Sequence, residues 1–253
     1  MISLPRKLRH GEEADLVEHL DELRSRIVVS LIAVTAGFAV AYMFHADLIH
    51  WLNAALPPGR RHPITLGVAE PFMTSVKISL AAGFALALPV VLWQVWSYFA
   101  PAIQPHAQRT VAVFVAFATG LFAIGVGFGY RVALPAAVHF LTGYDTNLYD
   151  VQVRAQSYYS FALMVLVAVG VVFEVPPFVL ALVRLRIVSA ARLRHSWRGG
   201  LAAMAVLAVA LPGVDPVTTT LEMIPLMALY LLSIGLATLF ERRWFAVATP
   251  AVE

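Results

Sequence analysis

The chain has 253 residues, of which 60% are hydrophobic and 13% are charged, and its mean hydropathy is +0.78. Soluble domains average about 45–50% apolar and roughly 25% charged residues, so this composition excludes an ordinary soluble domain and indicates a polytopic membrane protein. The absence of cysteine excludes disulfide bonds and thiolate metal sites, and the net charge of +3 gives no reason to expect a nucleic-acid partner.

A charged segment, residues 1–26, precedes the first apolar segment, and we predict that it forms an amphipathic helix at the membrane surface. In a helix, Glu18, Glu22 and Arg26 share one face because they are four residues apart. Three leucines form an apolar stripe beside that face: Leu16, Leu20 and Leu23. On pattern alone, the simplest interpretation is a solvated entry helix with salt bridges one turn apart. No small-residue cleavage site follows the first apolar segment, so we expect a retained transmembrane helix there.

Five apolar segments have about the 20 residues that a helix needs to cross the hydrocarbon core. They are residues 27–44, 71–98, 109–130, 157–183 and 217–240. A sixth segment, 199–211, has 13 residues, which corresponds to about 20 Å of helix. We therefore predict an all-α bundle of six transmembrane helices, with Pro89 kinking the second. The segments 45–70, 99–108 and 131–156 are predicted to be loops, and the first of them contains a turn-rich stretch at 57–61.

The distribution of lysine and arginine predicts that both termini are cytoplasmic, because cytoplasmic loops carry an excess of these residues. With six spans and this orientation, 13 of them lie on the cytoplasmic side, 4 lie outside, and Lys77 falls within the second span. The four outside are Arg60, Arg61, Arg131 and Arg154. No internal repeat of 20–50 residues is visible, which weighs against an inverted-repeat transporter.

Motifs that would indicate a known enzyme chemistry are absent from the sequence. There is no phosphate-binding loop ending in Gly-Lys-Ser/Thr, no His-Glu-x-x-His and no Gly-x-Ser-x-Gly. The eight histidines share no metal-ligand spacing, so we expect neither a metal site nor a cofactor. Gly125 and Gly129, four residues apart in the third apolar segment, favour close helix packing over a nucleotide-binding fingerprint.

One carboxylate, Glu174, lies deep in the fourth apolar segment, roughly 15 Å from its end at helical rise. A charge at that depth costs several kcal/mol unless it is protonated, paired or hydrated. The Pro176-Pro177 pair interrupts the helix beside it. Two interpretations remain open. Glu174 is either a protonated side chain that is hydrogen-bonded to a neighbouring helix, or a polar contact site in a cavity that faces the bundle interior. Glu222, in the last apolar segment, is a weaker case of the same kind.

Five stretches of the sequence, taken together and in order, resemble one family. They are His19-Leu20-x-Glu22-Leu23-Arg24-x-Arg26, Glu70-Pro71-Phe72, Gln94-Val95-Trp96-x-x-Phe99-Ala100-Pro101-Ala102, Phe173-Glu174-Val175-Pro176 and Asp215-Pro216. The set resembles TatC, the polytopic receptor subunit of the twin-arginine protein translocase, over nearly the whole chain. The resemblance implies one membrane domain, 1–253, with a cytoplasmic N-terminal helix (1–26), a concave six-helix bundle (27–240) whose helices five and six are short, and a cytoplasmic tail (241–253).

The resemblance also implies a function. A protein of this family recognises twin-arginine signal peptides on folded cargo and takes part in export that is independent of the Sec pathway and driven by the proton gradient. The implied partners are TatA-like and TatB-like single-span subunits, together with further copies of the chain in the receptor complex. The implied location is the cytoplasmic (inner) membrane of a prokaryote, and no catalytic residue is implied.

The resemblance places the signal-peptide site at Glu22, whose carboxylate suits a guanidinium group. The other residues expected at this site are Leu20, Arg24, Tyr98, Pro101 and Gln108. The family usually has a second acid after the histidine of the first cytoplasmic loop, but here Ala107 occupies that position. We therefore expect Glu22, with Asp21 or Glu18 nearby, to carry most of the arginine recognition. Polar contact with partner subunits is expected at Glu174, Pro176, Asp215 and Thr219. An external cap is expected at Glu70, Pro71 and Phe72.

Three other functional classes compete with this interpretation. A proton-coupled transporter would use Glu174 for coupling and the broken fourth span as a gate, although the sequence lacks internal symmetry. An intramembrane enzyme would need a paired nucleophile and base at membrane depth, where only the isolated Glu174 and Glu222 are found. A purely structural scaffold would not explain an acidic helix at the membrane surface.

Overall fold

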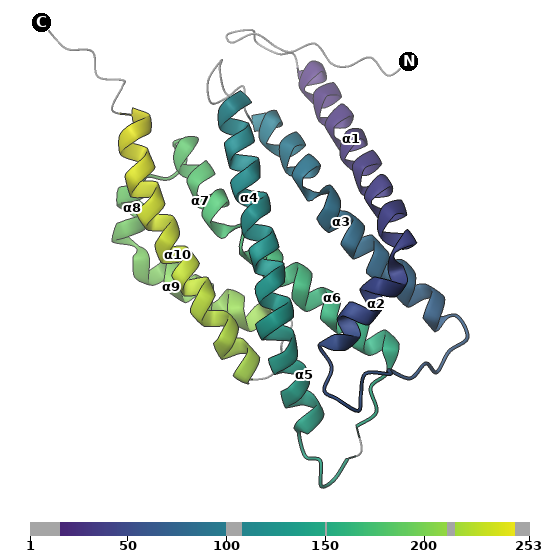
Figure 1. The fold of residues 1–253 in the computed structure, drawn as a ribbon. Coiled ribbons are helices and arrows are strands. Elements are labelled where there is room, and N and C mark those ends of the chain that lie inside the picture. The colour runs from purple at the N-terminus through teal and green to yellow at the C-terminus, as the bar shows by residue number, and fades with distance from the viewer. Residues whose placement is uncertain (1–15, 100–107, 150, 212–215, 246–253) are drawn as a thin grey trace, which may run out of the picture. The chain divides into compact units, whose positions relative to one another are not determined.

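The computed structural model describes residues 16–99, 108–149, 151–211 and 216–245, and it describes side chains in 20–98, 111–149, 151–211 and 216–241. These residues are almost entirely helical, and their β structure is limited to an isolated bridge between Ile64 and Arg154. The elements are α1 (Leu16–Met43), α2 (His45–Ala54), α3 (Glu70–Phe99), α4 (Gln108–Phe128), η2 (Gly129–Ala133), α5 (Leu134–Gly143), α6 (Ala155–Val172), α7 (Val175–Arg184), α8 (Ala190–His195), α9 (Trp197–Ala210) and α10 (Pro216–Phe245) (Figure 1).

Five helical segments are long and apolar enough to cross a membrane, as the sequence predicted. They are Leu20–Met43, Glu70–Tyr98, Val111–Gly143, Ala155–Arg184 and Pro216–Glu241. The sixth predicted span corresponds to α9, an apolar helix of only 14 residues. The protein is therefore an all-helical, multi-pass membrane protein, while the count of six spans and the side on which the termini lie stay predictions.

Three expectations about element lengths are wrong. The predicted loop 45–70 begins with α2, because Leu48 and Leu52 recur four residues apart and Leu52 is buried. The predicted loop 131–156 is helical as far as Gly143. The sixth helix is not short, since α10 has 30 residues.

The third span continues past its predicted end through a π-helical turn, η2. The backbone N–H of Leu134 bonds to the carbonyl of Gly129, five residues earlier, so the chain adds a residue to one turn without losing its hydrogen bonds. The Arg131 side chain is exposed there, which lets a charged residue sit inside a helix whose next residues are apolar. A polar residue is therefore not a sufficient signal for the end of this helix.

The chain divides into two compact units. The first comprises Met1–Trp51 and Gly67–Gly120, and in it α1 and α3 lie side by side along their length (Figure 1). Their backbones touch at two glycines: a Cβ atom on Gly37 would lie 2.4 Å from the carbonyl oxygen of Gly83, and one on Gly83 would lie 2.4 Å from the amide nitrogen of Phe38. Small residues are what allow two membrane helices to approach this closely.

The second unit comprises Leu52–Leu66 and Leu121–Glu253, and α10 packs there against α7, α8 and α9 (Figure 1). Its core includes Val172, Ala208, Leu211 and Leu226. The end of α4 and the start of η2 pack tightly against α6 and the residue that follows it. A Cβ on Gly125 would meet the Phe173 ring at 2.7 Å, and one on Gly129 would lie 3.3 Å from Leu166. The predicted packing role of this glycine pair is confirmed.

Residues 52–66 are tied to segment 142–159 of the same unit by a set of polar contacts. Residues 57–60 form a turn in which the Arg60 amide donates a hydrogen bond to the Pro57 carbonyl. Gly59 has a φ of 94° in this turn, a conformation that favours glycine. The Arg60 side chain donates to the carbonyl of Thr142 at 2.7 Å. Ile64 exchanges backbone hydrogen bonds with Val153 and Ala155. The buried Tyr158 hydroxyl donates to the Leu52 carbonyl at 2.5 Å.

We expect Gly83→Ala to destabilise the first unit, because the added methyl would overlap the backbone of α1 and force the two helices apart. The expected loss is about 1–3 kcal/mol, the range for overpacking, measured as a lower midpoint of thermal unfolding in detergent. Gly127→Ala is the matched control, since nothing lies within 4 Å of its added Cβ. An unchanged midpoint for Gly83→Ala would contradict the close approach.

Tyr158→Phe is expected to lower stability by about 0.5–1.5 kcal/mol, because the Leu52 carbonyl would lose the Tyr158 hydroxyl as a donor and keep only the backbone amide of Ala55. The measurement is the same thermal unfolding in detergent. Tyr149→Phe serves as the control, since Tyr149 is 65% exposed. Equal unfolding midpoints for the two variants would show that the Tyr158 hydroxyl does not stabilise the contact between residues 52–66 and 142–159.

Candidate functional site

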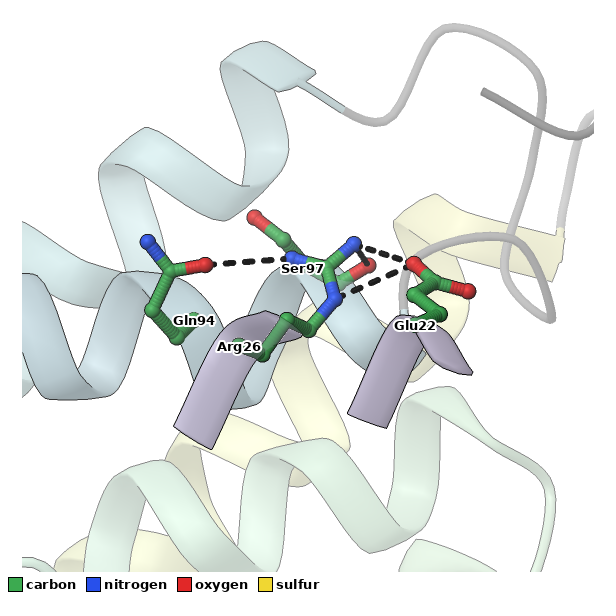
Figure 2. A network of polar contacts seen from close by, with 4 residues as sticks. All are labelled: Glu22, Arg26, Gln94 and Ser97. Atoms are coloured by element: carbon green, nitrogen blue, oxygen red, sulfur yellow. Dashed lines mark hydrogen bonds and ion pairs between the residues drawn. The ribbon is translucent and has the colours of Figure 1, made fainter. Parts of the chain in front are cut away.

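The Glu22 carboxylate belongs to a polar network that joins the first turns of α1 to the last turns of α3. Arg26, one turn further along α1, donates to Glu22 through both Nε and Nη2. The same guanidinium donates from Nη1 to the side-chain oxygen of Gln94 at 3.4 Å and from Nη2 to the carbonyl of Ser97 at 3.2 Å (Figure 2). The predicted pairing of Glu22 with Arg26 is confirmed, and it extends to a second helix.

The close approach of α1 and α3 explains why these side chains meet. Eleven residues separate Arg26 from Gly37, and eleven also separate Gly83 from Gln94. Eleven residues are about three helical turns, so each polar residue lies on the same face of its helix as the glycine. The helices run in opposite directions, because the beginning of α1 meets the end of α3. The glycine contact therefore sets the register that brings Arg26 to Gln94.

The other predicted signal-peptide residues are only partly brought together. Leu20 and Arg24 are exposed on α1, and Tyr98 is half-buried in the last turn of α3, so all three belong to the same unit as Glu22. Pro101 lies outside the described residues. Gln108 is the first residue of α4, but its side chain is not among those described. Among the described residues, the geometry groups Glu22 with Arg26, Gln94 and Ser97.

The sequence indicated Gln94 only as part of a motif and missed Ser97 altogether. The spacing of Glu22 and Arg26 was enough to predict their pair, because it depends on one helix. The contact with Ser97 uses a backbone carbonyl, which any residue type would offer. No pattern in the sequence could have identified it without the register of α1 against α3.

Glu174 occupies the break between α6 and α7, as the sequence predicted. It is the residue before α7, it is half-buried, and its Oε1 is enclosed without a hydrogen-bond donor among the described residues. Pro176 and Pro177 are buried in the first turn of α7. The first amides of a helix have no partner within it, so two prolines there remove two donors that would otherwise be unsatisfied in an apolar layer.

The remaining predicted residues take local roles. Glu70 is the buried first residue of α3, and its carboxylate accepts a hydrogen bond from the amide of Gly67 at 3.2 Å. Pro71 follows it in the first helical turn, where a missing amide hydrogen is tolerated, and Phe72 is exposed. Thr219 is half-buried on α10, whereas Asp215 lies outside the described residues. The described residues form no cluster of three or more His, Asp or Glu side chains that would hold a metal ion.

Comparison with known proteins identifies the family. The sequence matches the family model described as Sec-independent protein translocase protein (TatC) over residues 18–225. Proteins of that name from Deinococcus radiodurans and Aquifex aeolicus are each 34% identical to the chain. The first alignment covers 90% of this chain and 87% of the relative, and the second covers 90% and 96%.

Solved structures agree with the sequence comparison. The structure described as "Crystal Structure of Twin Arginine Translocase Receptor- TatC" superposes with a TM-score of 0.73 at 33% identity, covering 87% of this chain and 98% of the other. The structure of TatC in DDM gives a TM-score of 0.75 at 32% identity, covering 87% and 99%. The chain therefore belongs to the TatC family, and it is a multi-spanning component of the Sec-independent twin-arginine protein translocase rather than an enzyme.

Proposed function

We propose that this protein is the signal-peptide receptor of its translocase and that it binds twin-arginine signal peptides of folded proteins at the Glu22 end of α1. The observation that carries the proposal is the half-buried Glu22 carboxylate, held against the last turns of α3 in the network of Figure 2. It is supported by the similarity to solved structures that are described as the twin-arginine translocase receptor.

A fixed carboxylate suits the recognition of arginine. A guanidinium group offers five N–H donors in a rigid plane, and charge-assisted bonds to a carboxylate are roughly twice as strong as neutral ones. Asp21 is exposed next to Glu22 and adds negative charge at the same end of α1. Ala107 stands where the family resemblance leads us to expect a second acid, so Glu22 supplies the main carboxylate of the proposed site.

We propose an orientation with both termini in the cytoplasm and six spans, α9 being the fifth. The excess of lysine and arginine in the segments that would then be cytoplasmic supports it. The signal-peptide site would lie at the cytoplasmic surface of a prokaryotic inner membrane, where a folded cargo protein arrives. Export is then driven by the proton gradient, with TatA-like and TatB-like single-span subunits and further copies of this chain in the same complex.

We further propose that Glu174 contacts a polar residue of a single-span partner subunit. Its Oε1 is enclosed and lacks a donor within the described part of the chain, and an unpaired carboxylate in an apolar layer is costly. A polar side chain on a partner helix would supply the missing donor. Pro176 beside it, and Thr219 and Asp215 near the start of α10, extend the proposed contact, and Glu70, Pro71 and Phe72 belong to the proposed external cap.

Glu22→Gln is expected to weaken binding of a twin-arginine signal peptide by about tenfold or more, because a charge-assisted hydrogen bond contributes about 1.5–3 kcal/mol. Site-specific crosslinking of a signal peptide to the protein in membranes measures this directly. Asp47→Asn is the control, since Asp47 is an exposed acid on α2. Wild-type crosslinking by Glu22→Gln would refute the proposed site.

Glu174→Ala is expected to reduce crosslinking to the single-span subunits severalfold while leaving crosslinking to the arginine motif near the wild-type level. The physical reason is that the alanine side chain removes the acceptor that a partner's polar group would use, at a cost of about 1–3 kcal/mol. Both signals are measured in the same membranes. Loss of the arginine-motif signal with retained subunit crosslinking would refute this assignment.

A further inference from the structure

Arg26 binds one oxygen of Glu22 and leaves the other open. Nε and Nη2 both donate to Oε1, with the Nε–Oε1 distance at 3.0 Å. No described residue donates to Oε2, although a carboxylate has about four lone-pair sites for hydrogen bonds. The side chains of Arg26 and Glu22 are 21% and 16% exposed, so the pair is largely sheltered but still reachable (Figure 2).

The guanidinium of Arg26 is itself fixed from the side of α3. Ser97 lies two residues before the end of α3, where carbonyl groups have no partner within the helix. A cationic side chain is favourable at such a helix end, both as a donor and through the helix dipole. Together with Gln94, the Ser97 carbonyl gives Arg26 acceptors that do not depend on Glu22. Arg26 is thus held in place and in turn holds the Glu22 carboxylate.

An ordinary exposed pair one helical turn apart adds little to stability, because both side chains remain flexible. Here the hydrogen bonds to α3 restrain Arg26, whose Nε and Nη2 in turn hold Oε1 of the Glu22 carboxylate. A planar guanidinium needs a matching orientation of its acceptor, whereas the ammonium of lysine acts as a point charge. Orientation of Glu22 therefore affects the binding of arginine more than the binding of lysine.

We propose that Arg26 is a positioning and specificity-determining residue of the signal-peptide site, which rests on the function proposed above. It binds Oε1 of Glu22 and presents Oε2 to an arginine of the signal peptide. Arg26 shows the geometry that such a guest would use, because its own Nε and Nη2 converge on a single carboxylate oxygen. The consequence is selection of arginine over lysine at this position of the peptide.

The test is a binding titration of the full-length protein with two synthetic signal peptides that differ only in carrying Arg-Arg or Lys-Lys. The variants are Arg26→Gln, Arg26→Lys and Gln94→Leu, and Arg194→Gln is the control because it removes an exposed arginine on α8. Arg26→Gln is expected to weaken binding of the Arg-Arg peptide about tenfold, the effect of one charge-assisted hydrogen bond. Binding of the Lys-Lys peptide should change little, so the discrimination falls by the same factor.

Arg26→Lys keeps the charge, but a lysine cannot donate hydrogen bonds to Glu22, Gln94 and Ser97 together. It should therefore also lose the preference for the Arg-Arg peptide. Gln94→Leu keeps Arg26 and its pair with Glu22, and it should lower discrimination by a smaller factor. This variant decides the question if Arg26→Gln fails to fold. Arg194→Gln should bind both peptides like the wild type.

Several outcomes would overturn the proposal. Tighter binding of the Arg-Arg peptide by Arg26→Gln would show that Arg26 competes with the peptide for Glu22. An equal loss for both peptides would show that Arg26 only maintains the fold. If folded Arg26→Gln prefers the Arg-Arg peptide over the Lys-Lys peptide as strongly as the wild type, the proposal is rejected. If Arg26→Gln does not fold, the same result for Gln94→Leu rejects it. If Glu22→Gln binds the Arg-Arg peptide like the wild type, the proposed function is rejected. If Glu22→Gln loses binding but Arg26→Gln still discriminates between the two peptides like the wild type, only the positioning role of Arg26 is rejected.

Discussion

The apolar interior of a membrane requires that every backbone amide and carbonyl find its partner within the protein, and most features of this fold follow from that constraint. The spans are helices because a helix satisfies its own backbone. Where the helical path changes, it does so with little loss of hydrogen bonding. The turn η2 replaces a four-residue bond with a five-residue bond at Leu134, and the break between α6 and α7 places Pro176 and Pro177 where amide donors would be unsatisfied.

In the first unit, the absence of side chains at two glycines lets two helix backbones come into contact. Gly37 and Gly83 remove the side chains that would separate α1 from α3, and van der Waals contact replaces them. This contact has a consequence three turns away, where Arg26 reaches Gln94 and the carbonyl of Ser97. A packing detail inside the bundle therefore determines how a carboxylate at the end of a helix is oriented, which is why a fold variant such as Gly83→Ala bears on the site.

In the second unit, the two carboxylates of the apolar segments have different surroundings. Glu222 is fully buried within the helical packing of α10, on the same face as Thr218, whereas Glu174 is half-buried at the break before α7. Burial inside the unit favours a structural role for Glu222. Partial exposure at a break, with one enclosed oxygen that lacks a donor among the described residues, favours a contact outside the chain for Glu174.

The sequence by itself determined the class of the protein, its five long apolar helices, the break at Glu174 and the pairing of Glu22 with Arg26. These features depend on hydropathy summed over one segment or on the spacing within one helix, and such local information is present in the chain order. Only the tertiary structure decided that Arg26 binds α3, that residues 52–66 are tied to 142–159, and that the third helix continues through Arg131. Those outcomes depend on the register between elements distant in sequence, on backbone carbonyls that any residue carries, and on which side of a helix remains exposed.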